Sequence, residues 1–163
     1  NDRTTHEGEY FRAENASMLP RPVRGHMPIW IGGVGEKRTL KMTARHATGW
    51  NAAYVSAEEF RRLNGVLDRH CESIGRDPGT VERSVNLMFD LGKDEAVLAA
   101  QWGDMWERVA GGSLNGSADQ AAERVLAFRD AGADLVNVAL RAPVDPDLLE
   151  QYLTEIAPAL RSA

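Results

Sequence analysis

Cysteine is almost absent from this sequence of 163 residues, in which Cys71 is the single example. One thiol can form no internal disulfide and no metal site of several cysteines. We interpret Cys71, which stands among polar residues in the middle of an expected helix, as a bystander thiol in a reducing compartment. The histidines are His6, His26, His46 and His70. They are too far apart along the chain for two of them to share one helical face, so no metal site is expected.

Long apolar runs and an excess of positive charge are missing too. No stretch approaches the roughly 18 apolar residues that a membrane-spanning helix needs, and the N-terminus lacks the pattern of a signal peptide. The net charge of -5 at pH 7 argues against binding to nucleic acid or anionic lipid, since both need clustered lysine and arginine. The chain is therefore expected to be cytoplasmic, with no nucleic-acid or membrane partner.

The signatures of two large hydrolase classes are absent as well. The sequence contains no His-Glu-x-x-His pattern and no Gly-x-Ser-x-Gly pattern. Zinc-dependent hydrolysis and serine-hydrolase chemistry therefore find no support.

What the sequence does contain is an alternation of short apolar runs and amphipathic stretches. Residues 1–27 carry several prolines and predict an extended connector or a small hairpin, whereas residues 28–163 carry the alternation. Strands are expected at residues 28–31, 49–53, 83–89 and 135–140. Helices are expected at residues 36–47, 56–74, 94–110, 118–131 and 145–160. Ser56 with Glu59, and Ser117 with Gln120, predict capping boxes at two helix starts.

Four strands that are each followed by a helix predict a parallel α/β sheet with right-handed crossovers. One irregularity is the extra helix between the third and fourth strands. A complete (β/α)8 barrel needs eight such units in about 250 residues, so this chain has the size of half a barrel. A small open, doubly wound sheet of four parallel strands is the competing architecture. The sequence pattern does not separate the two.

The most informative segment follows the first expected strand, where Gly32, Gly33 and Gly35 precede a helix. Closely spaced glycines let backbone N–H groups approach an anion, and the helix N-terminus adds partial positive charge. The segment therefore predicts a phosphate-binding turn. It matches neither the Walker pattern nor the dinucleotide pattern, because Lys37 and Arg38 stand where the latter has its third glycine. A tight turn with a structural purpose alone is the alternative interpretation.

Residues 28–51 resemble a signature of the luciferase-like monooxygenase family, in particular of the branch that uses the deazaflavin coenzyme F420. They begin Pro-Ile-Trp-Ile-Gly-Gly-Val-Gly-Glu-Lys-Arg-Thr-Leu and end Ala-Thr-Gly-Trp-Asn. The likeness extends to Glu-Gly-Glu-Tyr-Phe at residues 7–11 and to Gly-Ser-Ala-Asp-Gln at residues 116–120, so it covers nearly the whole chain. One departure is Thr48, since the family usually has aspartate at this position.

The resemblance implies the C-terminal half of a (β/α)8 barrel of the bacterial-luciferase type. It implies an oxidoreductase that catalyses hydride transfer or monooxygenation of a small-molecule substrate, with F420 or alternatively FMN as cofactor. The cofactor-binding residues that it implies are Gly32, Gly33, Val34, Gly35, Glu36, Trp50 and Asn51. Core packing is the other interpretation of Trp50. No catalytic acid or base is assigned.

Three further expectations concern the rest of the molecule. The chain opens at Asn1 in a polar stretch, so we expect that it continues upstream and is inactive by itself. Half a barrel would expose strand edges and a sheet face, which predicts a homo-oligomer. The strands expected to bear that exposure contain Ile29, Ile31, Val85, Leu87, Phe89, Val136 and Val138.

Arg141, Asp90 and Phe89 lie near strand ends, where a barrel presents substrate contacts. A non-enzymatic phosphate-binding or self-assembling α/β module is the alternative function.

Overall fold

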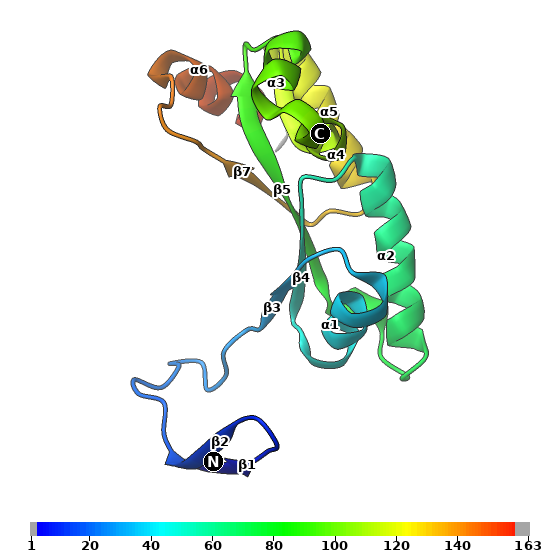
Figure 1. Ribbon diagram of the computed structural model, residues 1–163, viewed down its shortest axis with the longest axis vertical. Coiled ribbons are helices and arrows are strands. Elements are labelled where there is room, and N and C mark those ends of the chain that lie inside the picture. The colour runs from blue at the N-terminus through cyan, green and yellow to red at the C-terminus, as the bar shows by residue number, and fades with distance from the viewer. Residues whose placement is uncertain (1–2, 159–163) are drawn as a thin grey trace.

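The computed structural model describes residues 3–158, in which a small hairpin precedes a parallel α/β unit (Figure 1). The hairpin consists of β1 (Thr4–Glu7) and β2 (Arg12–Ala16), which pair antiparallel. Figure 1 shows this hairpin apart from the sheet, at the end of an extended linker. Residues 1–27 thus contain both structures that the sequence left open, a hairpin and an extended connector.

One parallel sheet of five strands follows the linker. Its strands are β3 (Trp30–Gly32), β4 (Gly49–Ala53), β5 (Glu82–Leu91), β6 (Ser113–Gly116) and β7 (Leu135–Ala139). The long strand β5 organises the sheet, since β4 and β6 pair with successive parts of one of its edges and β7 pairs with the other edge. Strand β3 pairs with β4. All of these pairings are parallel, as the alternation of strands and helices predicts.

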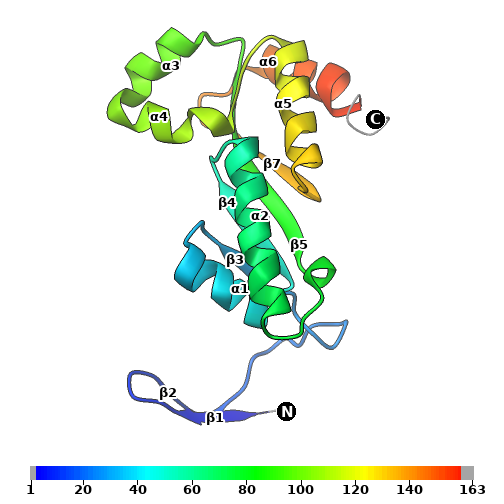
Figure 2. The same cartoon turned by 90° about the vertical axis from the view of Figure 1, so that its right-hand side faces the viewer.

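Helices α1, α2 and α5 cover one face of this sheet, as Figure 2 shows. Leu98 of α3 and Trp106 of α4 pack around Met88 of β5, whose side chain lies on the other face. The helices follow one another along the chain. They are η1 (Glu36–Leu40), α1 (Lys41–His46), α2 (Ala57–Glu72), η2 (Pro78–Thr80), α3 (Glu95–Trp102), η3 (Gly103–Met105), α4 (Trp106–Val109), η4 (Ala110–Gly112), α5 (Ala118–Asp130), α6 (Pro146–Gln151) and η5 (Tyr152–Ile156). Among residues 3–158, no helix is long and apolar enough to span a membrane.

Both helix starts that were predicted from serine caps are confirmed. Ser56 Oγ accepts a hydrogen bond of 3.1 Å from the Glu59 N–H at the start of α2, whereas the Glu59 carboxylate binds Arg62, so only half of the predicted box forms there. Ser117 and Gln120 form the complete reciprocal box at the start of α5. These contacts satisfy N–H groups that have no partner inside a helix, so the local sequence fixes where α2 and α5 begin.

The core lies between the sheet and its helices. Val85 and Leu87 on β5 are fully buried there, and Phe89, Val136 and Val138 pack against the same core. The expectation that Val85 and Leu87 would be exposed is therefore wrong. They point toward α2 and α5, on the covered face of the sheet.

The other face carries a row of polar residues beside apolar ones. Asn51 pairs in register with Ser84, and Asn86 pairs with Asn137. These residues alternate with the buried residues of their strands, so their side chains lie on the face opposite the helices. The exposed apolar residues at its edge include Ile29, which is 53% exposed. Leu135, which pairs in register with Ser84, is 44% exposed. Self-association stays a prediction.

Two elements differ from the sequence prediction between β5 and α5. The single helix expected over residues 94–110 is wrong, because Gly103 has a φ of 54° and divides this region into α3 and α4. A backbone in this left-handed region cannot continue a helix. Residues 113–116, where no strand is expected from the sequence, form β6 beside Met88–Leu91.

Candidate functional site

The glycine turn begins where β3 ends at Gly32, and β4 holds it from the side. The Gly33 N–H donates to Asn51 O at 3.0 Å, and Trp50 Nε1 donates to Gly33 O at 2.8 Å. Gly33 has a φ of 123°, a backbone conformation that side-chain-bearing residues rarely adopt. The peptide groups on both sides of Gly33 are thereby fixed, and the chain turns sharply into η1.

The backbone N–H groups that follow are free to bind a ligand. Within residues 3–158, the amides from Val34 to Arg38 have no hydrogen-bond acceptor. They lie at the N-terminus of the continuous η1 and α1 helix, where orphan donors and partial positive charge favour an anion. The shallow depression at this place is lined by Val34, Gly35, Glu36, Lys37, Arg38 and Thr39. A Cβ at Gly35 would lie only 2.9 Å from Thr39 Oγ1, so the close turn also needs glycine there.

The charges around the depression favour an anion as well. Arg62 Nη2 binds the Glu36 carboxylate at 2.9 Å, and Arg62 Nε binds Glu59 at 2.7 Å. The hydrogen bond from Arg62 lowers the pKa of Glu59, and those to Glu59 and Glu36 raise the pKa of Arg62. Lys37 and Arg38 have no ion-pair partner in the described part of the chain. Arg62 is shared between Glu36 and Glu59, so these three groups keep one negative charge, against the two positive charges of Lys37 and Arg38.

Trp50 and Asn51 lie behind this turn and support it. Trp50 is fully buried and stacks on Phe60 with ring centroids 5.2 Å apart. It is therefore a core residue that reaches the turn through its bond to Gly33. The side-chain amide of Asn51 donates to Ser84 Oγ at 2.7 Å and to Asn86 Oδ1 at 3.0 Å in the row of polar residues. Of the site residues that the resemblance implies, Val34, Gly35 and Glu36 line the depression, and Gly33, Trp50 and Asn51 fix its backbone.

Thr48, the departure from the family pattern, has a structural contact. Its Oγ1 accepts from the Ile29 N–H at 2.7 Å and donates to Ile29 O at 2.9 Å. A carboxylate at this position could accept but could not donate to the carbonyl. Thr48 therefore joins the entry of β3 to the entry of β4, away from the strand ends that carry the glycine turn.

A second cleft opens at the carboxyl ends of β5 and β7, with a volume of about 550 Å³. Its lining residues are Asp90, Lys93, Gln101, Trp102, Arg141, Ala142 and Pro143. Sequence reasoning considered Asp90 and Arg141 here but missed Lys93 and Trp102. Lys93 follows Asp90 by three residues, and this spacing could have indicated their ion pair, in which Lys93 Nζ binds Asp90 Oδ1 at 3.0 Å.

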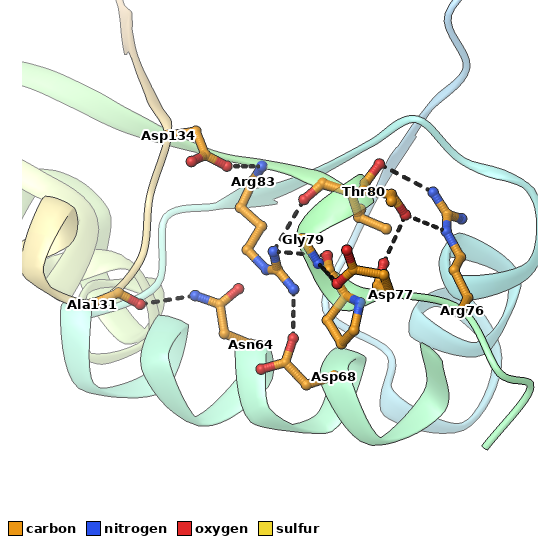
Figure 3. A network of polar contacts seen from close by, with 11 residues as sticks. Asn64, Asp68, Arg76, Asp77, Gly79, Thr80, Arg83, Ala131 and Asp134 are labelled. Atoms are coloured by element: carbon orange, nitrogen blue, oxygen red, sulfur yellow. Dashed lines mark hydrogen bonds and ion pairs between the residues drawn. The ribbon is translucent and has the colours of Figure 1, made fainter. Parts of the chain in front are cut away.

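A polar network at the opposite ends of the strands also went unpredicted (Figure 3). Arg83 Nη2 binds Asp68 Oδ1 on α2 at 2.5 Å, and its backbone N–H donates to Asp134 Oδ2 at 2.7 Å. Asn64 Nδ2 donates to Ala131 O at 2.8 Å. These contacts join α2, β5 and the end of α5 at the amino ends of the strands. Polar contacts at that end of a barrel serve stability.

The lone thiol is part of the core rather than of a site. Cys71 is fully buried, although its sequence neighbours are polar. Burial raises the pKa of the Cys71 thiol, so it stays neutral near pH 7. Its contribution to stability is complete below the pKa of about 8.5 in the unfolded chain and is lost as pH rises through the raised folded value.

We therefore expect Cys71 to react slowly with the aromatic disulfide DTNB at pH 8. Both burial and the small thiolate fraction oppose attack on the reagent. The labelling rate is measured in buffer and in urea, and it should rise strongly when the chain unfolds. Equal rates in the two conditions would contradict the buried position.

Comparisons with known sequences identify one family and related enzymes. The profile of the family described as luciferase-like monooxygenase matches residues 1–110. An F420-dependent hydroxymycolic acid dehydrogenase of Mycobacterium tuberculosis is 26% identical over 110 residues, which are 68% of this chain and 29% of that enzyme. An F420-dependent glucose-6-phosphate dehydrogenase of Mycolicibacterium gilvum is 27% identical over 95 residues, 57% of this chain and 28% of that enzyme. The chain thus covers less than a third of either relative.

Solved structures agree on the fold. An F420-dependent secondary alcohol dehydrogenase, solved with an F420-acetone adduct, superposes with a TM-score of 0.82 at 15% identity, over 99% of this chain and 57% of that one. The EDTA monooxygenase of Chelativorans sp. BNC1 superposes with a TM-score of 0.69 at 20% identity, over 98% of this chain and 50% of that one. At these identities the likeness establishes the arrangement of strands and helices alone.

Proposed function

Since this chain belongs to the luciferase-like monooxygenase family, we propose that it is part of an F420-dependent oxidoreductase and that its glycine turn binds the phosphate of the cofactor. The parallel sheet is then a partial (β/α)8 barrel rather than a small open sheet, as its superposition on larger enzymes shows. The observation that carries the proposal is the run of unpartnered amides from Val34 to Arg38. F420, when bound, supplies the hydride chemistry, and the protein supplies binding and orientation.

The contacts of the turn suit this task. The amides of Val34–Arg38 donate to phosphate oxygens at a helix N-terminus, and Lys37 and Arg38 add positive charge. Trp50 holds the Gly33 carbonyl, so the amides are aimed before the ligand arrives. Arg62, which Glu36 shares with Glu59, reduces the repulsion that the Glu36 carboxylate would exert on a phosphate.

The topology supports a position of the cofactor ring on the same side of the sheet. Strands β3, β5 and β7 belong to one parallel sheet, so their carboxyl ends point to the same side, with β5 continuing to Leu91 beyond Ser84, the residue level with Gly32. In barrels this side carries the active site. A cofactor whose phosphate lies at Val34–Arg38 can therefore extend its ring toward the cleft at the ends of β5 and β7, where a small-molecule substrate would meet it.

An NMR titration of the 15N-labelled chain tests this proposal. F420 and FMN each carry a phosphate, whereas riboflavin is FMN without it. We expect F420 to shift the amide resonances of Val34–Arg38 most strongly, FMN to shift them less, and riboflavin to leave them in place.

Two results would contradict the proposal in different ways. Unmoved amide resonances at Val34–Arg38 with both phosphate-bearing compounds would remove the phosphate site, and with it the only contact that ties the chain to a cofactor. Tighter binding of FMN than of F420 would keep the site but assign the chain to flavin.

A further inference from the structure

Arg141 lies over an aromatic ring at the cleft between the ends of β5 and β7. Its Cζ lies 4.7 Å from the ring centroid of Trp102, the last residue of α3. Trp102 is half-buried and packs against a small core cluster of Met88, Leu98, Trp106 and Val109. A guanidinium over a fixed indole ring is attracted to it, and its plane of donors is pre-organised.

The other charges of the cleft are already paired. The Asp90 carboxylate is 7% exposed and accepts from Lys93 Nζ at 3.0 Å and from Ser113 Oγ at 2.9 Å. Arg141 has no ion pair and no hydrogen bond with any residue of 3–158. Asp90 and Lys93 cancel, so the cleft keeps the one positive charge of Arg141.

We propose that Arg141 binds an anionic group of the substrate, either a carboxylate or a phosphate. Both groups match the planar fork of the guanidinium and can accept two parallel hydrogen bonds from it. Trp102 positions the fork, and Lys93 stands beside it as a further donor. That the bound anion belongs to a substrate rests on the function proposed above. The anion site itself rests on the contacts of Arg141.

This anion site is separate from the glycine turn. Val34–Arg38 follow β3, whereas Arg141 follows β7, and β4 and β5 lie between those strands in the sheet. A molecule bound at Arg141 therefore occupies the carboxyl edge of the sheet without using the amides assigned to the cofactor. The two sites suit two different ligands of one reaction.

Titration of the 15N-labelled chain with inorganic phosphate and, separately, with acetate tests the assignment. The signal is the indole N–H resonance of Trp102, identified by its loss in W102F. We expect this resonance to shift and saturate with one or both anions. The anion with the lower dissociation constant identifies whether the site prefers a phosphate or a carboxylate. Arg141→Gln should weaken that binding by at least about tenfold, and Arg141→Lys should weaken it less.

Arg129→Gln is the matched control, because Arg129 is another exposed arginine and pairs with Asp130 at the end of α5. It should leave the Trp102 titration unchanged. An Arg141→Gln chain that binds as tightly as the original would overturn the proposal, as would equal weakening by Arg129→Gln. The Trp50 indole resonance reports whether each variant is folded.

The same spectra keep this inference apart from the proposed function. Trp102 shifts without any response of the Val34–Arg38 amides to F420 or FMN would contradict the cofactor assignment alone. Responsive amides with a Trp102 resonance that stays unmoved by either anion would overturn the Arg141 site alone.

Discussion

Trp50→Ala should destabilise the chain by about 3–5 kcal/mol, which is a large part of the stability of an ordinary domain. Trp50 is fully buried and lies nearly parallel to Phe60, which in turn meets Phe128 edge to face. Removing the indole leaves a cavity between β4, α2 and α5, because Phe60 and Phe128 cannot both move into it. Urea unfolding followed by circular dichroism measures the loss.

Trp50→Phe separates the ring from its N–H group. It keeps most of the aromatic contact but leaves Gly33 O without its donor at 2.8 Å, which costs about 1–3 kcal/mol when the carbonyl is buried. Trp30→Phe is the control, since Trp30 is 40% exposed on the edge strand β3 and should change stability little. A Trp50→Ala chain as stable as Trp30→Phe would contradict the central place of Trp50 in the core.

Elements with local signals could be predicted from the sequence. β4 has the bounds that its sequence indicated, residues 49–53. The start of α5 follows from Ser117 and Gln120 alone. Both signals act within a few residues, so no knowledge of distant contacts is needed.

Elements that depend on distant pairing could not be predicted. β6 exists because β5 continues past the end of β4 and offers a free edge at Met88–Leu91. Nothing in the sequence of Ser113–Gly116 itself indicates that it pairs with β5. The side of β5 that meets α2 and α5 was likewise hidden, since a period of two residues does not say which side of a strand faces the core.

The candidate site shows the same division. The glycines marked the turn correctly in place, yet the sequence could not show that the Gly33 N–H is already bound to Asn51 O. That single pairing moves the available donors onward to Val34–Arg38. The contact of Arg141 with Trp102 joins residues far apart in the chain, so only the fold could reveal it.

Gly33→Val should lower the affinity of the chain for F420 by about tenfold to a hundredfold, a loss of about 1–3 kcal/mol. Gly33 has a φ of 123°, and a Cβ there would lie 3.3 Å from Thr39 Cγ2. Valine therefore forces the backbone out of this conformation and turns the following amides away from the phosphate. The quenching of F420 fluorescence measures the affinity.

Gly75→Val provides the matched control for this variant. Gly75 has a φ of 71° with open space around it, and it follows α2, far along the chain from the turn. Valine is strained at both positions, so both variants should lose stability by about 1–2 kcal/mol. Only Gly33→Val should lose F420 affinity, because only it lies between β3 and the amides of Val34–Arg38. Unchanged affinity in Gly33→Val, or an equal loss in Gly75→Val, would show that the geometry of this turn does not govern cofactor binding.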